Sequence, residues 1–406
     1  MKSWLGIVGI GEDGVSGLAP AACALIETAE LLVGGARHLA MVPPALVSPG
    51  AERLIWRRPL ADTLGDIAAW RGRRVTVLAS GDPLWYGIGT VLAHRFPLDE
   101  MTIVPHPGAF SLAAARLGWA IEACTALTLH GRPLDGLRLH LAPRARLLLL
   151  SQDGDTPRSV AALLSVSGWG PSRMTVFEHL GGACEAMVCG TADSWGNRPA
   201  ADLNTIAIDC VPASGAKPLS RLAGLPDDVF EHDGQLTKRE IRAITLARLA
   251  PLPGEMLWDV GAGCGSVAIE WLRSVPGGAA VAIEGNDHRA AMIARNAAQL
   301  GVPGLRVVPG RAPEALSGLP PPDAVFIGGG TANPGLLDEA WAALRPGGRL
   351  VANVVSIEGE RAVLDWHSRH GGELTRIAIS RAESLGAHHA WRPLMPVTQL
   401  FAAKSV

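Results

Sequence analysis

The sequence predicts an α/β protein of two domains whose strands are mostly parallel. Its 406 residues exceed one ordinary hydrophobic core and suit two domains of about 200 residues each. With 48% hydrophobic and 18% charged residues, both halves can bury a sizeable core, which argues against disorder. Apolar strand-like runs also alternate with alanine-rich helical stretches along the whole chain, a pattern typical of parallel α/β architecture.

Seven apolar runs predict strands in the first half. They cover residues 4–9, 30–33, 74–79, 102–104, 146–150, 174–178 and 204–211. Residues 212–232 then mix proline, glycine and serine without sustained periodicity, so we expect a linker there. This places one domain at residues 1–211 and the other at residues 233–406.

The second half opens with a predicted helix within residues 233–250. Ile241, Leu246 and Leu249 recur at helical spacing, and Pro251 ends the pattern. We expect the last two strands to pair antiparallel across a polar loop and to close the sheet. The predicted strands of this half cover residues 256–260, 280–284, 305–308, 324–327, 349–355, 374–380 and 397–402.

Charge and cysteine usage exclude several classes of protein. A formal net charge of −2 gives no global basic field for nucleic acid. The six cysteines show neither C-x-x-C nor a zinc-ligand spacing, which favours a reducing compartment and no bound metal. We find neither a signal peptide nor an apolar run of the ~20 residues that span a bilayer. We therefore expect a soluble, cytoplasmic protein.

Two glycine patterns follow predicted strands. The opening stretch GIVGIGEDG spaces Gly9, Gly11 and Gly14 as G-x-G-x-x-G, but a dinucleotide fold needs a helix that starts at the third glycine. Here Pro20 favours a later helix start, so we interpret the motif as a glycine turn at the edge of a substrate cleft. The stretch EHLGGACE, which contains His179, matches no metal-ligand spacing, and we interpret it as a turn too.

A second glycine pattern, WDVGAGCGSV, is more informative. It places Asp259 at the end of a strand, followed by Gly261, Gly263 and Gly265 and then a helix. Alternate glycines let the backbone turn tightly and approach a ligand. Another acid, Glu284, ends the next predicted strand. This combination resembles the first motif of class I methyltransferases, which bind S-adenosylmethionine and use such an acid to accept both ribose hydroxyls.

Stretches of the first half resemble the tetrapyrrole methylase family. They are IVGIGEDG, LASGDPLWYGIG, HPGAFSLAAARLG and LNTIAID. The resemblance implies a class III methyltransferase fold of two α/β lobes in the first half. In the second half, the class I resemblance implies a Rossmann-like domain with a mostly parallel, seven-stranded sheet.

The order of the two halves resembles the two-domain methyltransferases of cobalamin (corrin) biosynthesis. This resemblance implies that the first half methylates C5 of precorrin-6B, while the second methylates C15 and removes carbon dioxide from the C12 acetate, giving precorrin-8. It also implies one S-adenosylmethionine site in each domain. The residues implied at the class I site are Thr237, Asp259, Gly261, Ala262, Gly263, Cys264, Gly265, Glu284 and Ala312. Those implied in the first half are Gly81, Asp82, Trp85, Phe110 and Ser111.

Methyl transfer from a sulfonium to carbon depends mainly on positioning, which can supply ~7–11 kcal/mol of barrier reduction. Decarboxylation needs an electron sink, and a protonated conjugated tetrapyrrole provides one. Candidates that hold or protonate the substrate are His232, Lys238, Arg239, Asn353, His388 and His389, each of which could instead be an ordinary polar surface residue. Candidates that clamp its carboxylates through bidentate contacts are Arg132, Arg144, Arg158, Arg311 and Arg392.

Other functions remain open from sequence. An RNA or other small-molecule methyltransferase is the main alternative, although no run of Lys and Arg exceeds two residues. A nicotinamide-dependent dehydrogenase is disfavoured by Ser266, because the dinucleotide fingerprint has its third glycine or alanine at that position. A non-catalytic S-adenosylmethionine sensor is a further alternative. We expect a tetrapyrrole substrate, no nucleic acid, no membrane and, by analogy, a homo-oligomer.

Overall fold

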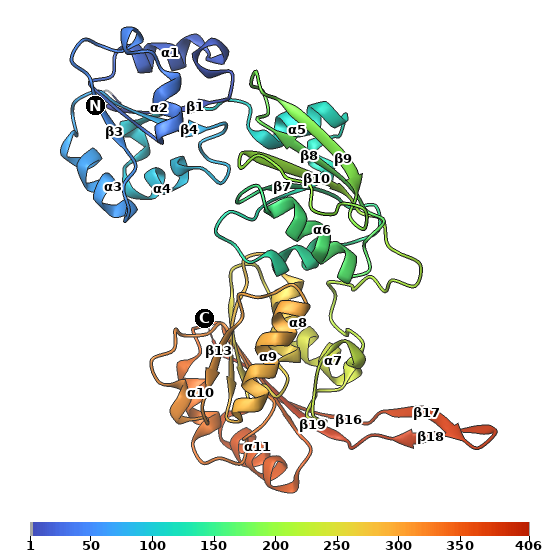
Figure 1. The fold of residues 1–406 in the computed structure, drawn as a ribbon. Helices are drawn as coiled ribbons and strands as arrows, with labels where there is room; N and C mark the ends of the chain where they lie inside the picture. The colour runs from blue at the N-terminus through green and yellow to red at the C-terminus, as the bar shows by residue number, and fades with distance from the viewer. Residues whose placement is uncertain (1–2, 406) are drawn as a thin grey trace. The chain divides into compact units, whose positions relative to one another are not determined.

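The computed structural model describes residues 3–405, and the chain divides into two compact units (Figure 1). The first unit comprises residues 1–134 and 140–217, and the second comprises residues 135–139 and 218–406. The main division, between Lys217 and Pro218, lies inside the segment expected to be a linker. No helix of the described part is long and apolar enough to cross a membrane.

The first lobe of the first unit is a parallel five-stranded sheet of order β3-β2-β4-β1-β5. On β1, Leu5 and Ile7 pack into one apolar cluster, whereas Val8 and Ile10 pack into another. Both faces are thus covered, as parallel sheets require. The strands are β1 (Leu5–Ile10), β2 (Leu31–Gly34), β3 (Glu52–Ile55), β4 (Val75–Ser80) and β5 (Met101–Val104), and the helices are α1 (Pro20–Glu27), α2 (Ala36–Met41), α3 (Leu60–Ala69) and α4 (Ile88–Arg95).

The second lobe has a mixed sheet of order β6-β7-β10-β8-β9, in which only β6 and β7 are parallel. The strands of this lobe are therefore mostly antiparallel, in contrast to the mostly parallel strands predicted for the chain. A connection as short as residues 179–185 cannot carry a parallel crossover, which needs a dozen or more residues. The strands are β6 (Cys124–Thr128), β7 (Arg146–Leu150), β8 (Arg173–Glu178), β9 (Ala186–Thr191) and β10 (Asn204–Asp209), and the helices are α5 (Ala109–Leu117) and α6 (Thr156–Val166).

The second unit has the expected seven-stranded sheet, of order β13-β12-β11-β14-β15-β19-β16. Its last two strands along the chain pair antiparallel, as predicted. Trp271, Phe326 and Trp366 are among its most buried side chains. The strands are β11 (Met256–Val260), β12 (Ala279–Glu284), β13 (Arg306–Pro309), β14 (Ala324–Ile327), β15 (Arg349–Val354), β16 (Glu373–Ile377) and β19 (Val397–Ala403), and the helices are α7 (Arg239–Leu249), α8 (Ser266–Ser274), α9 (Asp287–Gln299), α10 (Leu336–Ala343) and α11 (Ile357–His370).

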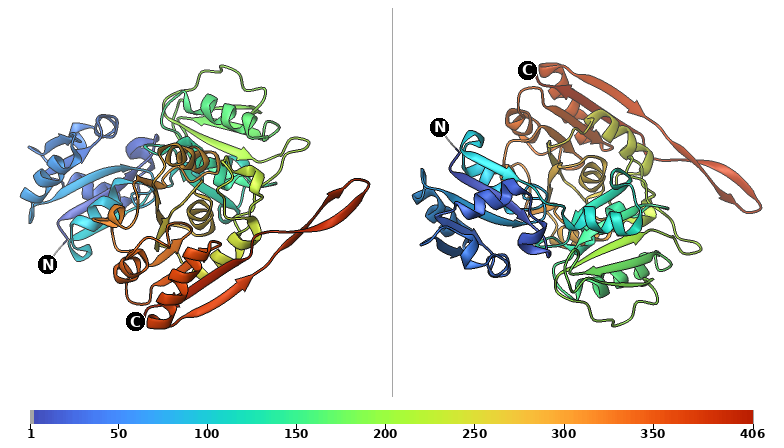
Figure 2. Two further views of the ribbon diagram at one scale, coloured as in Figure 1. Left: turned by 90° about the horizontal axis from the view of Figure 1, so that it is seen from below. Right: turned by 90° about the horizontal axis from the view of Figure 1, so that it is seen from above.

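A two-stranded hairpin replaces the polar loop expected before the last strand. Its strands, β17 (Ser380–Leu385) and β18 (His388–Pro393), turn at Gly386, where φ is +59°. The hairpin extends away from the sheet of the second unit (Figure 2). His388 and His389 therefore lie on an exposed strand rather than in a loop.

Other differences from the sequence predictions have local causes. The unpredicted strands β3, β6 and β9 all lie at sheet edges, where fewer side chains are buried and no long apolar run is needed. The helix expected within 233–250 begins only at Arg239, and the segment before it opens with a turn in which Asp233 accepts a hydrogen bond from the backbone N–H of Gln235. As expected, α1 begins at Pro20, which separates the opening glycine motif from the next α-helix.

Gly9 allows β1 to approach the loops that follow β4 and β5. A Cβ there would lie 2.0 Å from the carbonyl oxygen of Gly81 and 2.6 Å from the backbone nitrogen of His106. We predict that Gly9→Ala destabilises the first unit by about 1–3 kcal/mol or more, measured by calorimetry. Gly65→Ala is the matched control, because Gly65 lies in α3 with open space around it. That control should be neutral or stabilise by up to about 1 kcal/mol. Equal stability of both variants would contradict the packing argument.

Candidate functional site

A cavity of about 580 Å³ lies at the carboxyl ends of the parallel strands in the second unit. The central strand β11 has β12 on one side and β14 on the other, so the chain reverses its direction of winding here. Open α/β sheets bind ligands at this kind of switch point. The cavity walls include residues 260–263 at the end of β11, residues 283–285 at the end of β12 and residues 328–330 after β14.

The turn after β11 is built on three glycines in the left-handed region. Gly261, Gly263 and Gly265 have φ of +67°, +59° and +81°. A Cβ on Gly261 would lie 2.8 Å from the backbone nitrogen and carbonyl oxygen of Gly329. A Cβ on Gly265 would lie 2.7 Å from Cγ2 of Ile293 on α9. Glycine is thus needed both for the backbone conformation and for close approach.

Glu284 fixes the same turn from the next strand. Its Oε2 accepts a hydrogen bond of 2.8 Å from the backbone N–H of Gly263, and its Oε1 accepts one of 3.0 Å from that of Asn286. The side chain lines the cavity although the residue is only 7% exposed. A carboxylate held in this way presents its remaining lone pairs to the cavity without needing to reorganise.

Asp259 lies behind the turn and does not line the cavity. Its Oδ2 accepts a hydrogen bond of 2.9 Å from the backbone N–H of Ala268 in the first turn of α8. Its Oδ1 is buried without a partner among the described residues. Burial, with a smaller contribution from Glu284, raises the pKa of Asp259 to about 7. This residue thus positions the start of α8 rather than facing a ligand.

The residues expected to hold a cofactor here divide into two groups. Six of them line the cavity, namely Thr237, Gly261, Ala262, Gly263, Glu284 and Ala312. Asp259, Cys264 and Gly265 do not line it. Burial raises the pKa of the Cys264 thiol to about 11, so that side chain acts as a small core residue. Asn333 stabilises the opposite wall, because its Nδ2 donates a hydrogen bond of 3.0 Å to the carbonyl oxygen of Ala312.

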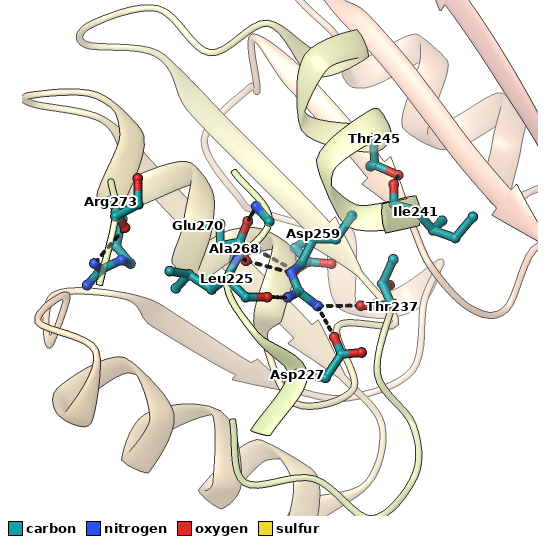
Figure 3. Close-up of polar contacts among 12 residues, drawn as sticks. Leu225, Asp227, Thr237, Ile241, Thr245, Asp259, Ala268, Glu270 and Arg273 are labelled. Carbon is teal, nitrogen blue, oxygen red and sulfur yellow. Dashed lines mark hydrogen bonds and ion pairs between the residues drawn. The ribbon is translucent and has the colours of Figure 1, made fainter. Parts of the chain in front are cut away.

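A buried arginine, Arg242, holds the segment that brings Thr237 to the cavity, and Figure 3 labels its partners Leu225, Asp227, Thr237 and Glu270. Arg242 on α7 is fully buried, and its Nε donates a hydrogen bond of 2.6 Å to Oε1 of Glu270 on α8. Its other nitrogens donate to the carbonyl oxygens of Leu225 and Thr237 and to the carboxylate of Asp227. The guanidinium therefore joins α7, α8 and the segment from 225 to 237 at one point.

The fold brings only some of the candidate catalytic residues to the cavity. Lys238 and Asn353 line the cavity, whereas His232, Arg239 and His388 are exposed and do not line it. Asn353 Nδ2 donates a hydrogen bond of 2.8 Å to Thr245 Oγ1, and its Oδ1 accepts one of 2.9 Å from Gln399. Both polar atoms of Asn353 are thus engaged, which fixes its orientation.

Of the five arginines considered from sequence as carboxylate clamps, Arg311 lines the cavity. Other cavity residues were not expected from sequence. Arg289 also lines the cavity, and its Nε donates a hydrogen bond of 2.7 Å to Asp233, whose pKa it lowers. The glycine-rich run 328–330 follows a strand, so it carried a usable sequence signal. Arg289 lies within a helix and carried none.

The first unit has a cavity of about 370 Å³ of its own. All of the residues expected to bind a cofactor in this half line it, namely Gly81, Asp82, Trp85, Phe110 and Ser111. Gly81 has φ of +55°, and a Cβ there would lie 2.6 Å from Cα of Gly108. The rings of Trp85 and Phe110 lie 5.6 Å apart, and Asp82 Oδ1 accepts a hydrogen bond of 2.8 Å from the backbone N–H of Leu84. Within residues 3–405, no group of three or more His, Cys, Asp or Glu side chains could hold a metal ion.

Comparisons with known proteins match both halves. The family described as Tetrapyrrole (Corrin/Porphyrin) Methylases matches residues 5–195, and the family described as Precorrin methyltransferase domain matches residues 228–404. A protein of Sinorhizobium sp named precorrin-6Y C(5,15)-methyltransferase (decarboxylating) is 50% identical over 399 residues, covering 98% of this chain and 96% of that protein.

Two further similar proteins have the same or a closely related name. A protein of Mycobacterium tuberculosis so named is 41% identical over 403 residues, covering 98% of this chain and 99% of its own length. The solved C-terminal domain of precorrin-6Y C5,15-methyltransferase from Rhodobacter capsulatus is 46% identical, with a TM-score of 0.43, and the match covers 46% of this chain and 100% of that domain. The similarity to the first two proteins extends over nearly the whole chain.

The pKa of Asp259 predicts a pH-dependent stability of the second unit. An unfolded aspartate titrates near about 3.9, whereas Asp259 in the folded chain titrates at about 7. The folded state therefore binds more protons between these values, and stability falls as the pH rises through this window, by about 4 kcal/mol at most. Asp259→Asn keeps an acceptor for Ala268 and should flatten this fall in urea unfolding of the ligand-free chain. Exposed Asp365→Asn is the control, and equal pH dependence of wild type and Asp259→Asn would contradict the assignment.

Removing Arg242 should destabilise the second unit selectively. Arg242→Met leaves the buried carboxylate of Glu270 without its cation, and breaking a buried pair in this way costs about 3–5 kcal/mol. Calorimetry should show a lower transition for the second unit and an unchanged one for the first. Arg361→Met is the matched control, because this side chain is 83% exposed and pairs with Asp365 only at 4.0 Å. If both variants unfold alike, the Arg242 network does not stabilise the unit.

Proposed function

The chain belongs to the family of decarboxylating precorrin-6Y C(5,15)-methyltransferases, and from this membership we propose that its two halves perform separate reactions on one tetrapyrrole. It is a methyltransferase of cobalamin biosynthesis that uses S-adenosylmethionine and a precorrin substrate. In our proposal, residues 1–211 methylate C5, and residues 233–406 methylate C15 and decarboxylate the C12 acetate. Each half binds its own S-adenosylmethionine.

One observation carries the proposal for the second half: a cavity that combines a glycine cradle with a fixed carboxylate. Its volume of about 580 Å³ lies within the range of about 300–1,000 Å³ typical of small-molecule sites. A side chain at Gly261 or Gly263 would meet neighbouring backbone at 2.8 Å or 3.0 Å, so the cradle depends on glycine. The cavity thus fits S-adenosylmethionine, which supplies an activated methyl group when bound.

In this scheme, Glu284 accepts hydrogen bonds from the ribose hydroxyls, while Thr237, Ala262 and Ala312 line the rest of the cofactor site. Backbone and side chain at these positions are already fixed, so binding costs little reorganisation. The methyl acceptor is brought to the open part of the same cavity. Positioning then supplies most of the rate enhancement.

Decarboxylation is assigned to the apolar residues of the cavity lining. They include Ile241, Ile379 and Leu394, and apolar side chains strip water from a carboxylate. The bond between the methylene carbon and the carboxyl carbon breaks, carbon dioxide leaves, and the electron pair enters the conjugated ring system. We assign to Lys238 the proton that the methylene carbon then takes, because its side chain is the cationic group on the loop that leads into α7. Asn353 orients the substrate.

The proposal for the first half rests on the cavity that gathers Gly81, Asp82, Trp85, Phe110 and Ser111. Two aromatic rings beside a glycine turn can hold an adenine or the edge of a flat macrocycle. We further expect a cytoplasmic homo-oligomer that binds neither nucleic acid nor membrane. The net charge of −2 supports the absence of nucleic acid, since no global positive field is present.

Calorimetric titration of two variants with S-adenosylmethionine tests the cofactor site of each half separately. The wild type should bind two equivalents per chain. Glu284→Gln should weaken one site by about 10–100-fold, because a charged hydrogen-bond acceptor is worth about 1.5–3 kcal/mol, while Asp82→Ala should weaken the other. Glu358→Gln is the control, because this residue is exposed on α11.

Mass spectrometry with precorrin-6B then tests the chemistry. The wild type should add two methyl groups and release carbon dioxide, Glu284→Gln should lose the C15 methyl and the decarboxylation, and Asp82→Ala should lose the C5 methyl. A single cofactor site in the wild type, or loss of both methyl groups at saturating cofactor in either variant, would contradict the division of labour.

A further inference from the structure

A carboxylate, a guanidinium and an imidazole meet beside the cavity of the first unit. Glu12 follows β1, Arg37 lies on α2, and His179 follows β8. The Glu12 carboxylate forms an ion pair with Arg37 and accepts a hydrogen bond of 3.1 Å from Nδ1 of His179. The Glu12 side chain is only 15% exposed. Three elements far apart in the sequence thus converge on one partly buried carboxylate.

Two further side chains fix the orientation of Arg37 by hydrogen bonds. Its Nη2 donates a hydrogen bond of 2.9 Å to Nε2 of His38 and one of 3.4 Å to Oγ of Ser80. Burial lowers the pKa of His38 to about 4, so this imidazole is neutral and its Nε2 can accept from the guanidinium. The charge of Arg37 is directed at Glu12 and is not free for a ligand.

The backbone around His179 is adapted to this contact. His179 has φ of +48°, a left-handed conformation that is uncommon for a residue other than glycine and costs on the order of 1 kcal/mol or more. A Cβ on Gly182 would lie 2.7 Å from Cβ of Glu12. The turn at 179–182 therefore packs directly on Glu12, and its strained residue is the one that reaches the carboxylate.

The pair has the geometry of an oriented base. With Nδ1–H donated to Glu12, the neutral imidazole carries its lone pair on Nε2. Among residues 3–405, no partner of His179 Nε2 is found, and the side chain is 35% exposed. A carboxylate that fixes the tautomer and stabilises the imidazolium is the arrangement used in hydrolase triads.

The pair also lies next to the proposed cofactor site. Glu12 and Arg37 line a small cavity of about 80 Å³. This cavity and the one of about 370 Å³ share lining residues, which are Ser80, Gly81, Pro107 and Ala109. The two cavities therefore adjoin at these residues. His179 lines neither cavity and lies next to the smaller one through its 3.1 Å contact with Glu12.

We propose that His179, oriented by Glu12, accepts the proton that leaves C5 when this carbon is methylated. The inference rests on the proposed C5 reaction of the first half. The bond between sulfur and methyl breaks, the bond between C5 and methyl forms, and S-adenosylhomocysteine leaves. C5 keeps its place in the conjugated system only if its C–H bond then breaks, and that proton goes to Nε2 of His179.

A second imidazole–carboxylate pair provides the competing assignment. His106 Nε2 lies 3.4 Å from Oδ1 of Asp13, and His106 lines the larger cavity. It lines that cavity together with Asp82 and Trp85, which we assign to the methyl donor, and its side chain is only 12% exposed. Its position therefore suits the cofactor rather than the acceptor carbon.

The test compares His179→Asn, Glu12→Gln, His106→Asn and, as control, His94→Asn in the full chain. His94 is an exposed residue of α4 whose Nδ1 lies 2.8 Å from the carbonyl oxygen of Thr90 on its own helix turn. Single-turnover C5 methylation is followed by mass spectrometry with the C15-methylated, decarboxylated intermediate, prepared with C5 either protonated or deuterated. The C15 reaction of the same preparations monitors folding.

His179→Asn should slow C5 methylation by about 10²–10⁴-fold, leave the C15 reaction unchanged and be partly rescued by added imidazole. It should also acquire a deuterium isotope effect at C5, because proton loss becomes rate-limiting. Glu12→Gln should show a smaller loss, and ¹⁵N NMR should show that His179 no longer holds its proton on Nδ1.

Other outcomes overturn the inference. If His179→Asn is as active as His94→Asn, or if His106→Asn alone shows the rate loss and the imidazole rescue, His179 is not the acceptor. If the wild type leaves C5 unmethylated, or Asp82→Ala methylates C5 normally, the proposed function of the first half fails first. That result is distinguishable from failure of the further inference alone, in which the wild type methylates C5 and His179→Asn does so at the same rate.

Discussion

Both halves depend on backbone segments that approach one another more closely than any side chain would permit. A Cβ on Gly9 would lie 2.0 Å from the carbonyl oxygen of Gly81 in the first unit, and a Cβ on Gly261 would lie 2.8 Å from the backbone nitrogen of Gly329 in the second. Each contact lies at the carboxyl edge of a parallel sheet, where ligands bind in such folds; the first joins the end of β1 to a loop, and the second joins two loops. The cavities beside these contacts therefore owe their shape to glycine.

Loops that meet at glycine contacts need charged side chains to hold them in place. In the second unit, Arg242 and Glu270 are almost fully buried and tie the segment before α7 to α8. In the first, Arg37 holds Glu12, which in turn holds His179. A buried ion pair such as Arg242–Glu270 adds little net stability compared with apolar packing, but losing one partner is costly. The Arg37–Glu12 pair is only partly buried, with side chains 40% and 15% exposed, so its loss costs less. Both pairs fix the arrangement of the loops beside a candidate site.

Sequence reasoning recovered what depends on glycine spacing and on apolar strands, because both are local signals. The central strands, the late start of α1 and the cradle from Gly261 to Gly263 were all predictable. The edge strand β3 was not, because it has few buried side chains. The role of Asp259 behind the cavity and the contact between Glu12 and His179 depend on tertiary packing across 167 positions, which no local pattern encodes. His179 was visible in EHLGGACE only as part of a turn.

The proposed chemistry explains why the two candidate sites differ in their ionisable groups. Replacing hydrogen by methyl at C5 or C15 releases one proton, whereas loss of carbon dioxide leaves a carbon that takes one up. In the second half, the proton released at C15 offsets the proton taken up after loss of carbon dioxide. A cationic donor such as Lys238 and apolar side chains therefore suffice. In the first half nothing consumes the proton from C5, and a base with a fixed tautomer is required. The Glu12–His179 pair meets that requirement, and the second site, which gains and loses one proton per turnover, needs no equivalent of it.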